Sequence, residues 1–137
     1  MRIFVYAITL AALFGIGPAH ALTIEAVLDG PLMKRERVVE FVRDRAGGAV
    51  AQIPDVEQGG KYRLLVRVSS QPAGSPSRFL CLVEFELQRQ VIEQDTGYAY
   101  WAMIHSTTAW GTVPSETELW KTIGELVGKR VNSWVVD

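Results

Sequence analysis

The chain has 137 residues, of which 48% are hydrophobic and 21% charged, and its formal net charge is -1. This length fits one domain, and the apolar fraction excludes a disordered or low-complexity chain. The charge balance disfavours a dedicated nucleic-acid-binding protein, which needs a basic excess. A single cysteine excludes an internal disulfide and a multi-cysteine metal site.

Residues 1–21 have the pattern of a secretory signal peptide. Arg2 and the amino terminus supply positive charge, residues 3–17 are uncharged, and Ala19–Ala21 matches an A-x-A cleavage site. The alternative is a membrane anchor, but a membrane span needs about 20 apolar residues and this run is shorter. The residue directly after the cleavage site is Leu22, and not a cysteine that could carry a lipid. We therefore expect cleavage, a periplasmic or secreted location, no integral membrane span after processing, and one domain over residues 22–137.

A strand and then a helix are predicted next. Residues 22–28 alternate apolar and other side chains, as a half-buried strand does. Residues 32–46 then carry apolar side chains on one side and charged ones on the other, which favours a helix that ends at a glycine pair. A strand over 37–42 is the alternative, because valine and phenylalanine favour extended structure. Residues 47–60 predict a loop, with a short strand at 49–53 as an option.

Two alternating segments, 61–69 and 79–91, predict an antiparallel hairpin joined by turn-forming residues. When their apolar faces are aligned, two arginines and two glutamates share the opposite face. These are Arg63, Arg67, Glu84 and Glu86. Opposite charges on neighbouring strands stabilise a sheet by about 0.2–1 kcal/mol per pair, so the charges support the same register as the apolar side chains.

Residues 98–108 predict a third strand after a turn at 93–97. Simple alternation places Tyr98, Tyr100 and Ile104 on one face and Trp101, Met103 and His105 on the other. Because both faces carry large side chains, either the strand is covered on both sides or it exposes an aromatic face.

The last predicted element is a helix that begins at Ser115 and runs nearly to Asp137. Ser115 and Glu118 have capping-box spacing, and apolar side chains follow at helical spacing. Gly124 and Gly128 favour close packing against the sheet or a second helix. The fold class expected is therefore α+β: a small antiparallel β-meander of three to four strands, packed on one face by an N-terminal helix and a long C-terminal helix.

The sequence offers little chemistry for catalysis. After signal removal His105 is the single histidine, and Cys81 lies in an alternating strand pattern, where a cysteine acts as a small apolar side chain. Glu84 and Glu86 are interpreted as a solvated, arginine-paired face. No nucleophile-elbow, phosphate-loop or dinucleotide motif is present. We expect no catalytic residue, no metal, no cofactor and no enzymatic activity.

Aromatic residues are the candidates for partner binding. They are Tyr98, Tyr100, Trp101 and Trp110, and Trp110 is expected in a loop because glycine and proline follow it. The order of elements resembles that of small exported bacterial domains, accessory proteins of envelope assemblies among them. The function expected is an exported, soluble, non-enzymatic protein that binds another envelope protein, or itself, in an accessory or assembly role. The alternatives are a periplasmic small-ligand-binding protein with a pocket between sheet and helix, and, third, an enzyme.

Overall fold

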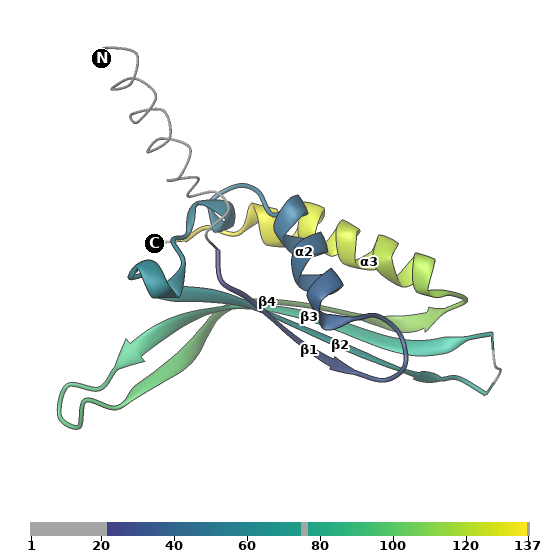
Figure 1. Cartoon of the computed structure of the whole chain (residues 1–137), viewed down its shortest axis with the longest axis horizontal. Coiled ribbons are helices and arrows are strands. Elements are labelled where there is room, and N and C mark those ends of the chain that lie inside the picture. The colour runs from purple at the N-terminus through teal and green to yellow at the C-terminus, as the bar shows by residue number, and fades with distance from the viewer. Residues whose placement is uncertain (1–21, 75–76, 137) are drawn as a thin grey trace, which may run out of the picture.

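The computed structural model describes residues 22–74 and 77–136 and has an α+β fold, a sheet with two helices on it (Figure 1). The strands and helices are β1 Ile24–Asp29, α2 Arg35–Arg45, β2 Tyr62–Pro72, β3 Phe79–Ile92, β4 Ala99–Val113 and α3 Glu116–Lys129. The 3-10 turns are η2 Val50–Gln52, η3 Val56–Gln58 and η4 Val131–Ser133. The predicted signal peptide lies outside the described residues, so its cleavage stays a prediction.

The sheet has the strand order β1-β2-β3-β4. Strands β2, β3 and β4 form the predicted antiparallel meander. The predicted α+β fold class is thus confirmed, with a mostly antiparallel sheet. The sheet is mixed because β1 pairs with β2 in parallel, from Ile24 opposite Leu64 to Asp29 opposite Ser69. The reason is the connection: α2 and the loop after it return the chain to the start of the sheet, so β2 begins beside the beginning of β1.

Both helices lie on the same face of this sheet (Figure 1). Alternate side chains of the first three strands point toward them, as the period of two requires. The core contains Ile24, Ala26, Leu64, Val66, Val68, Cys81, Val83, Phe85 and Leu87 from the strands and Val38, Val42, Leu119, Ile123 and Val127 from the helices. Burial of these apolar side chains is the main favourable term in folding.

Predictions for the helices are confirmed in part. Residues 37–42 are helical, not extended, because Val38 and Val42 lie one helical turn apart and both face the core. The optional strand at 49–53 is instead a 3-10 turn at residues 50–52. Ser115 Oγ accepts a hydrogen bond from the Glu118 amide at 3.4 Å, as a helix N-cap does.

The C-terminal helix is shorter than predicted, since α3 ends at Lys129 and not near Asp137. The chain leaves the helix in η4, where Val131 is buried, and Trp134 then stacks on His105 with 5.3 Å between ring centroids. Within α3, Gly124 faces α2: a Cβ at this position would lie 3.6 Å from the ring of Phe41. Close helix–helix packing is therefore found at Gly124, whereas a Cβ at Gly128 would meet no atom within 4 Å.

Strand β4 extends to Val113, five residues beyond the prediction, and contains an irregularity. Leu87 lies opposite His105, whereas its neighbour Gln88 lies opposite Met103, so Ile104 is an extra, bulged residue. The bulge reverses the alternation of β4. The expectation that Trp101, Met103 and His105 share one face is therefore wrong: His105 faces the helix side and the other two face the opposite side.

Candidate functional site

The helices leave the second face of the sheet uncovered (Figure 1). We call it the open face. Its apolar end holds Leu80, Leu82 and Trp110 with Ser69 and Gln71, and its far end holds Trp101 and Met103. Its centre holds Glu25, Arg63, Arg67, Glu84, Glu86 and Gln88, with the apolar Val27 and Leu65 among them. The open face thus combines an apolar end with a mainly charged centre.

The apolar end is built by pairing between β3 and β4. Leu82 and Trp110 are directly opposite each other, and Leu80 is two residues before Leu82 on the same face. Trp110 is 78% exposed, Leu82 39% and Leu80 38%. With Ser69 and Gln71 they line a shallow hollow of about 280 Å³. We call Leu80, Leu82 and Trp110 the apolar patch.

The charged centre is a connected network. Arg67 Nη1 donates to Glu84 Oε1 at 2.5 Å and to Glu86 Oε1 at 2.7 Å. Gln88 continues it, because its Nε2 donates to Glu86 Oε2 at 2.7 Å and its Oε1 accepts from Arg63 Nε at 2.7 Å. The predicted pairing of arginines with glutamates is thus confirmed for Arg67. It is wrong for Arg63, whose carboxylate partner is Glu25 on β1, at 3.1 Å.

These contacts fix the charge states of the network. Partial burial raises the pKa of Glu86, but the hydrogen bonds from Arg67 and Gln88 outweigh it and leave this pKa below its usual value. Hydrogen bonds to Glu84 and Glu86 raise the pKa of Arg67. The network therefore satisfies its own charges and offers few free groups to a ligand.

The four aromatic residues predicted to bind a partner do not form one surface. Trp110 lies in strand β4 and not in a loop, because Gly111 and Thr112 continue the ladder opposite Cys81 and Leu80. Its side chain is 78% exposed. Trp101 lies on the open face at the other end of β4, with its ring 4.3 Å from the Arg63 guanidinium carbon.

Tyr98 and Tyr100 belong to a third place, the tip of the β3–β4 hairpin. This hairpin extends past the end of the sheet, away from the helices (Figure 1). Both tyrosines are exposed there, as is Ile92 on the facing strand. The structure therefore brings Trp110 together with Leu80 and Leu82 rather than with the other three aromatics.

Sequence reasoning missed Leu80 and Leu82 as members of the site. The signal was available: in the alternation of β3 they occupy the phase otherwise held by Glu84, Glu86 and Gln88. Two leucines on the polar phase of a strand predict an apolar area on the solvent side. Their alignment with Trp110 depends on the pairing of β4 beyond residue 108, where the predicted strand ends.

His105 and Cys81, the two side chains considered for catalysis, both contact other residues in the structure. His105 stacks on Trp134, and its Nε2 lies 2.7 Å from the carbonyl oxygen of Val135. Cys81 is buried in the core, and this burial raises the pKa of its thiol. In residues 22–74 and 77–136, no three histidine, cysteine or acidic side chains lie close enough to hold a metal ion.

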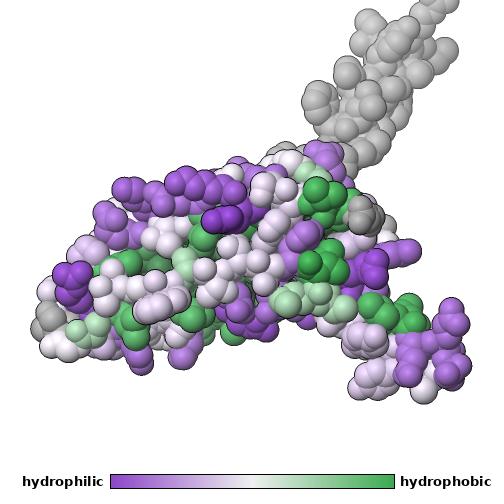
Figure 2. All heavy atoms as spheres, turned by 180° about the vertical axis from the view of Figure 1, so that it is seen from behind, coloured by the Kyte–Doolittle hydropathy of each residue, from purple (hydrophilic) through white to green (hydrophobic). Residues whose placement is uncertain are grey.

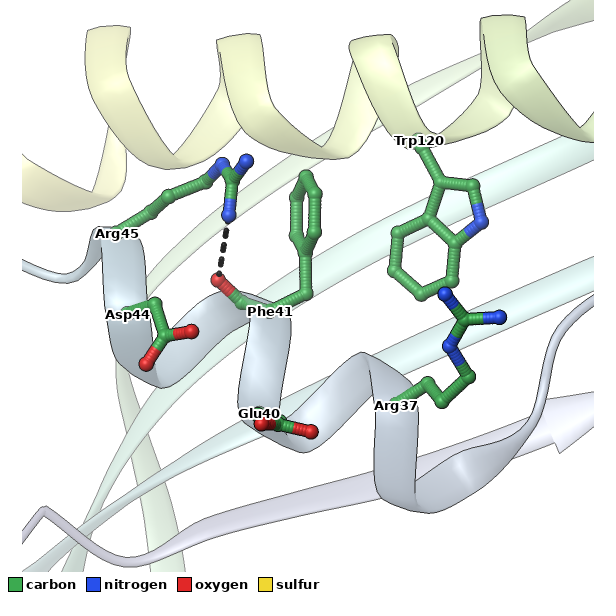
Figure 3. A pocket seen from close by; sticks show the side chains of 6 residues that line it. All are labelled: Arg37, Glu40, Phe41, Asp44, Arg45 and Trp120. Carbon is green, nitrogen blue, oxygen red and sulfur yellow. Dashed lines mark hydrogen bonds between the residues drawn. The ribbon is translucent and has the colours of Figure 1, made fainter.

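A groove also runs between the two helices (Figure 3). Its lining residues are Arg37, Glu40, Phe41, Asp44, Arg45 and Trp120. The Arg45 guanidinium lies 3.5 Å from the centroid of the Phe41 ring, that of Arg37 lies 6.0 Å from Trp120, and the two rings are 4.7 Å apart. The two arginines thus cover the faces of the aromatic rings. A cationic ligand would need these same faces to bind in the groove.

A second hollow, between β4 and α3, measures about 220 Å³. It is the place where the sequence-based alternative of a pocket between sheet and helix could be realised. Its small size is below the roughly 300–1,000 Å³ of typical ligand sites.

No family model matches the chain, and no curated protein matches it. Among solved structures, it is similar to the crystal structure of a putative lipoprotein from Caulobacter crescentus CB15, with 14% identity, a TM-score of 0.34, and coverage of 85% of this chain and 87% of the other. Similarity at this level carries no argument about fold or function.

Proposed function

We propose that this chain is an exported, non-enzymatic protein that binds another protein of the cell envelope through the apolar patch on its open face. The observation that carries the proposal is the position of Trp110, 78% exposed beside Leu82 on a sheet face that no helix covers. Tryptophan is enriched among the residues that dominate binding energy at protein interfaces.

The surroundings of the patch support protein binding rather than ligand binding. The hollow beside Trp110 measures about 280 Å³, below the roughly 300–1,000 Å³ of typical small-molecule sites. Beside it lies the Arg67 network, whose charges are already paired. An apolar area bordered on one side by paired polar groups is compatible with the apolar core and polar rim of protein–protein interfaces.

The non-enzymatic part of the proposal is supported by the two most reactive side chains. Cys81 lies in the core with a raised pKa, so its thiol stays protonated near neutral pH. His105 contacts Trp134 and Val135, and these contacts hold the C-terminal residues on the sheet. The polar contacts of both side chains are with backbone carbonyl oxygens, of Phe79 for Cys81 and of Val135 for His105.

The envelope location is supported by the sequence of residues 1–21, which has the order of a charged start, an apolar run and an A-x-A site. In the described part of the chain, no helix is long and apolar enough to cross a membrane. We propose a periplasmic or secreted location for the processed protein.

The experiment is capture of envelope proteins on the immobilised processed chain, with Trp110→Ala and Tyr98→Ala compared. Both residues are exposed aromatics, but only Trp110 belongs to the apolar patch. We expect a protein that is retained by the wild type and by Tyr98→Ala and is lost with Trp110→Ala. Retention by Trp110→Ala with loss on Tyr98→Ala would move the site to the hairpin tip, and equal retention by all three would refute the patch.

A further inference from the structure

Strand β4 is an edge of the sheet, and within residues 22–74 and 77–136 no further strand pairs with it. None of its fifteen residues, Ala99–Val113, is buried. The other edge, β1, has six residues and includes Glu25 and Asp29. In Figure 1, β1 is the strand nearest to the viewer. Figure 2 shows the molecule from behind, and residues of intermediate hydropathy, drawn pale, cover much of the centre of that view.

The sequence of β4 lacks the residues that protect such an edge. Natural proteins place lysine, other charged residues or proline on edge strands, because unpaired N–H and C=O groups otherwise pair with another strand. β4 reads AYWAMIHSTTAWGTV and contains no aspartate, glutamate, lysine, arginine or proline. Its one irregularity, the bulge at Ile104, leaves residues 105–113 as a regular strand.

A strand without charges is suited to pairing with a copy of itself, since no like charges meet. In an antiparallel pair about a twofold axis, opposite residues must point to the same face, so the axis passes through one residue position. The regular stretch 105–113 has its midpoint at Ala109. Self-pairing over the whole stretch therefore places Ala109 opposite the partner's Ala109 and Trp110 opposite the partner's Thr108.

Side chains on both faces fit this arrangement. On the open face, Trp110 gains a β-branched neighbour from the second copy, a favourable cross-strand combination, and the two tryptophans become diagonal neighbours. On the helix side the residues around the axis are small: Thr107, Ala109 and Gly111, with open space within 4 Å of the Cβ position of Gly111. The larger His105 and Val113 lie on the same side at the two ends of the stretch, where each would be opposite the other in the second copy.

We infer that two copies of this chain pair antiparallel through β4, about an axis at Ala109, and join their sheets into one eight-stranded sheet. The two apolar patches then lie side by side on one continuous face. This inference does not rest on the proposed envelope partner, because the self-pairing uses the edge of the strand. Since a single strand pair is a small interface, we expect a micromolar dissociation constant.

Sedimentation of the processed wild-type chain over a concentration series tests the dimer. We expect a monomer–dimer equilibrium that Thr108→Lys weakens by about tenfold or more, because its two new charges would be diagonal neighbours across the axis. The control Gln52→Lys adds the same charge at an exposed position in η2, outside the sheet, and leaves the equilibrium unchanged. The inference is overturned if the wild type stays monomeric at about 100 micromolar, near the upper limit of micromolar dissociation constants.

Disulfide trapping tests the register. Ala109→Cys places two thiols opposite each other at the axis, and we expect rapid crosslinking under mild oxidation. Ser106→Cys is the control on the same strand, since its two copies would be six positions apart, about 20 Å. Crosslinking of the control but not of Ala109→Cys overturns the assigned register. Envelope-protein capture by a monomeric Thr108→Lys variant would leave the proposed function standing, so the two proposals fail separately.

Discussion

Arg67 donates from Nη1 to the carboxylate of Glu86 at 2.7 Å, although the residue directly opposite Arg67 in the sheet is Glu84. One guanidinium nitrogen thus joins two carboxylates two residues apart on β3. Glu86 is the more enclosed of the two, with 14% of its side chain exposed. Its charge is therefore stabilised mainly by these hydrogen bonds and less by water.

The lowered pKa of Glu86 predicts an acid-dependent loss of stability. A carboxylate whose folded pKa is below its unfolded value of about 4.3 stabilises the folded state above that pH, and this contribution is lost as the pH falls through the folded pKa. We expect Glu86→Gln to be less stable than wild type at pH 7 by about 1 kcal/mol, discounted because Arg67 is partly exposed. Urea unfolding at several pH values should show the difference shrinking below about pH 4. A constant difference down to pH 3 would contradict the assignment.

The hairpin was predictable from sequence because its signals are local. In β2 and β3 the apolar phase and the charged phase agree on one register, and Arg67 beside Glu84 confirms it. The N-cap at Ser115 is equally local, since its hydrogen bond spans three residues. Patterns of this kind depend on neighbouring residues and so survive without knowledge of the rest of the fold.

The features that sequence reasoning missed depend on distant parts of the chain. The parallel pairing of β1 is decided by where α2 returns the chain, which the alternation of residues 22–28 does not encode. The bulge at Ile104 adds one residue to β4 without any glycine or proline to mark it. Gly111 predicts a loop around Trp110. In the structure Gly111 instead continues the strand, because it pairs with Cys81 of the neighbouring strand β3.

Asn132 is expected to stabilise the junction of the two helical ends. Its Oδ1 accepts from the Gly47 amide at 2.7 Å, and its Nδ2 donates to the carbonyl of Arg45 at 3.0 Å, at the end of α2. Asn132→Ala should lower the free energy of unfolding by about 1 kcal/mol, since both backbone groups lose their partner and one of the two hydrogen bonds is part-buried. Ser133→Ala is the control, because Ser133 Oγ bonds within its own turn, to Arg130. Equal effects of the two substitutions on urea unfolding would contradict this role.

Cys81→Ala should cost about 1 kcal/mol, as expected for a small cavity in the core. The native thiol should react slowly with alkylating reagents at neutral pH, because burial both shields it and raises its pKa. Reaction at the rate of the urea-unfolded chain would show that Cys81 is accessible and would reopen a redox role.

Mass spectrometry of the exported protein should give an amino terminus at Leu22. The side chain of Leu22 is 2% exposed and belongs to the core, so the domain is ordered from this residue onward. Processing after Ala21 would leave every described core residue in the mature chain. An intact Met1 on protein retained in membrane fractions would contradict the signal-peptide interpretation.

Trp110→Ala should leave the thermal midpoint nearly unchanged while it weakens association. The side chain is 78% exposed, so truncation removes little buried area from the monomer. At an interface the same truncation typically costs about 2 kcal/mol or more. The measurements are thermal unfolding, partner capture and sedimentation of the variant beside Leu119→Ala, a core substitution that should lower the midpoint by many degrees. If Trp110→Ala unfolds the domain as Leu119→Ala does, Trp110 is a core residue and the apolar patch loses its main binding group.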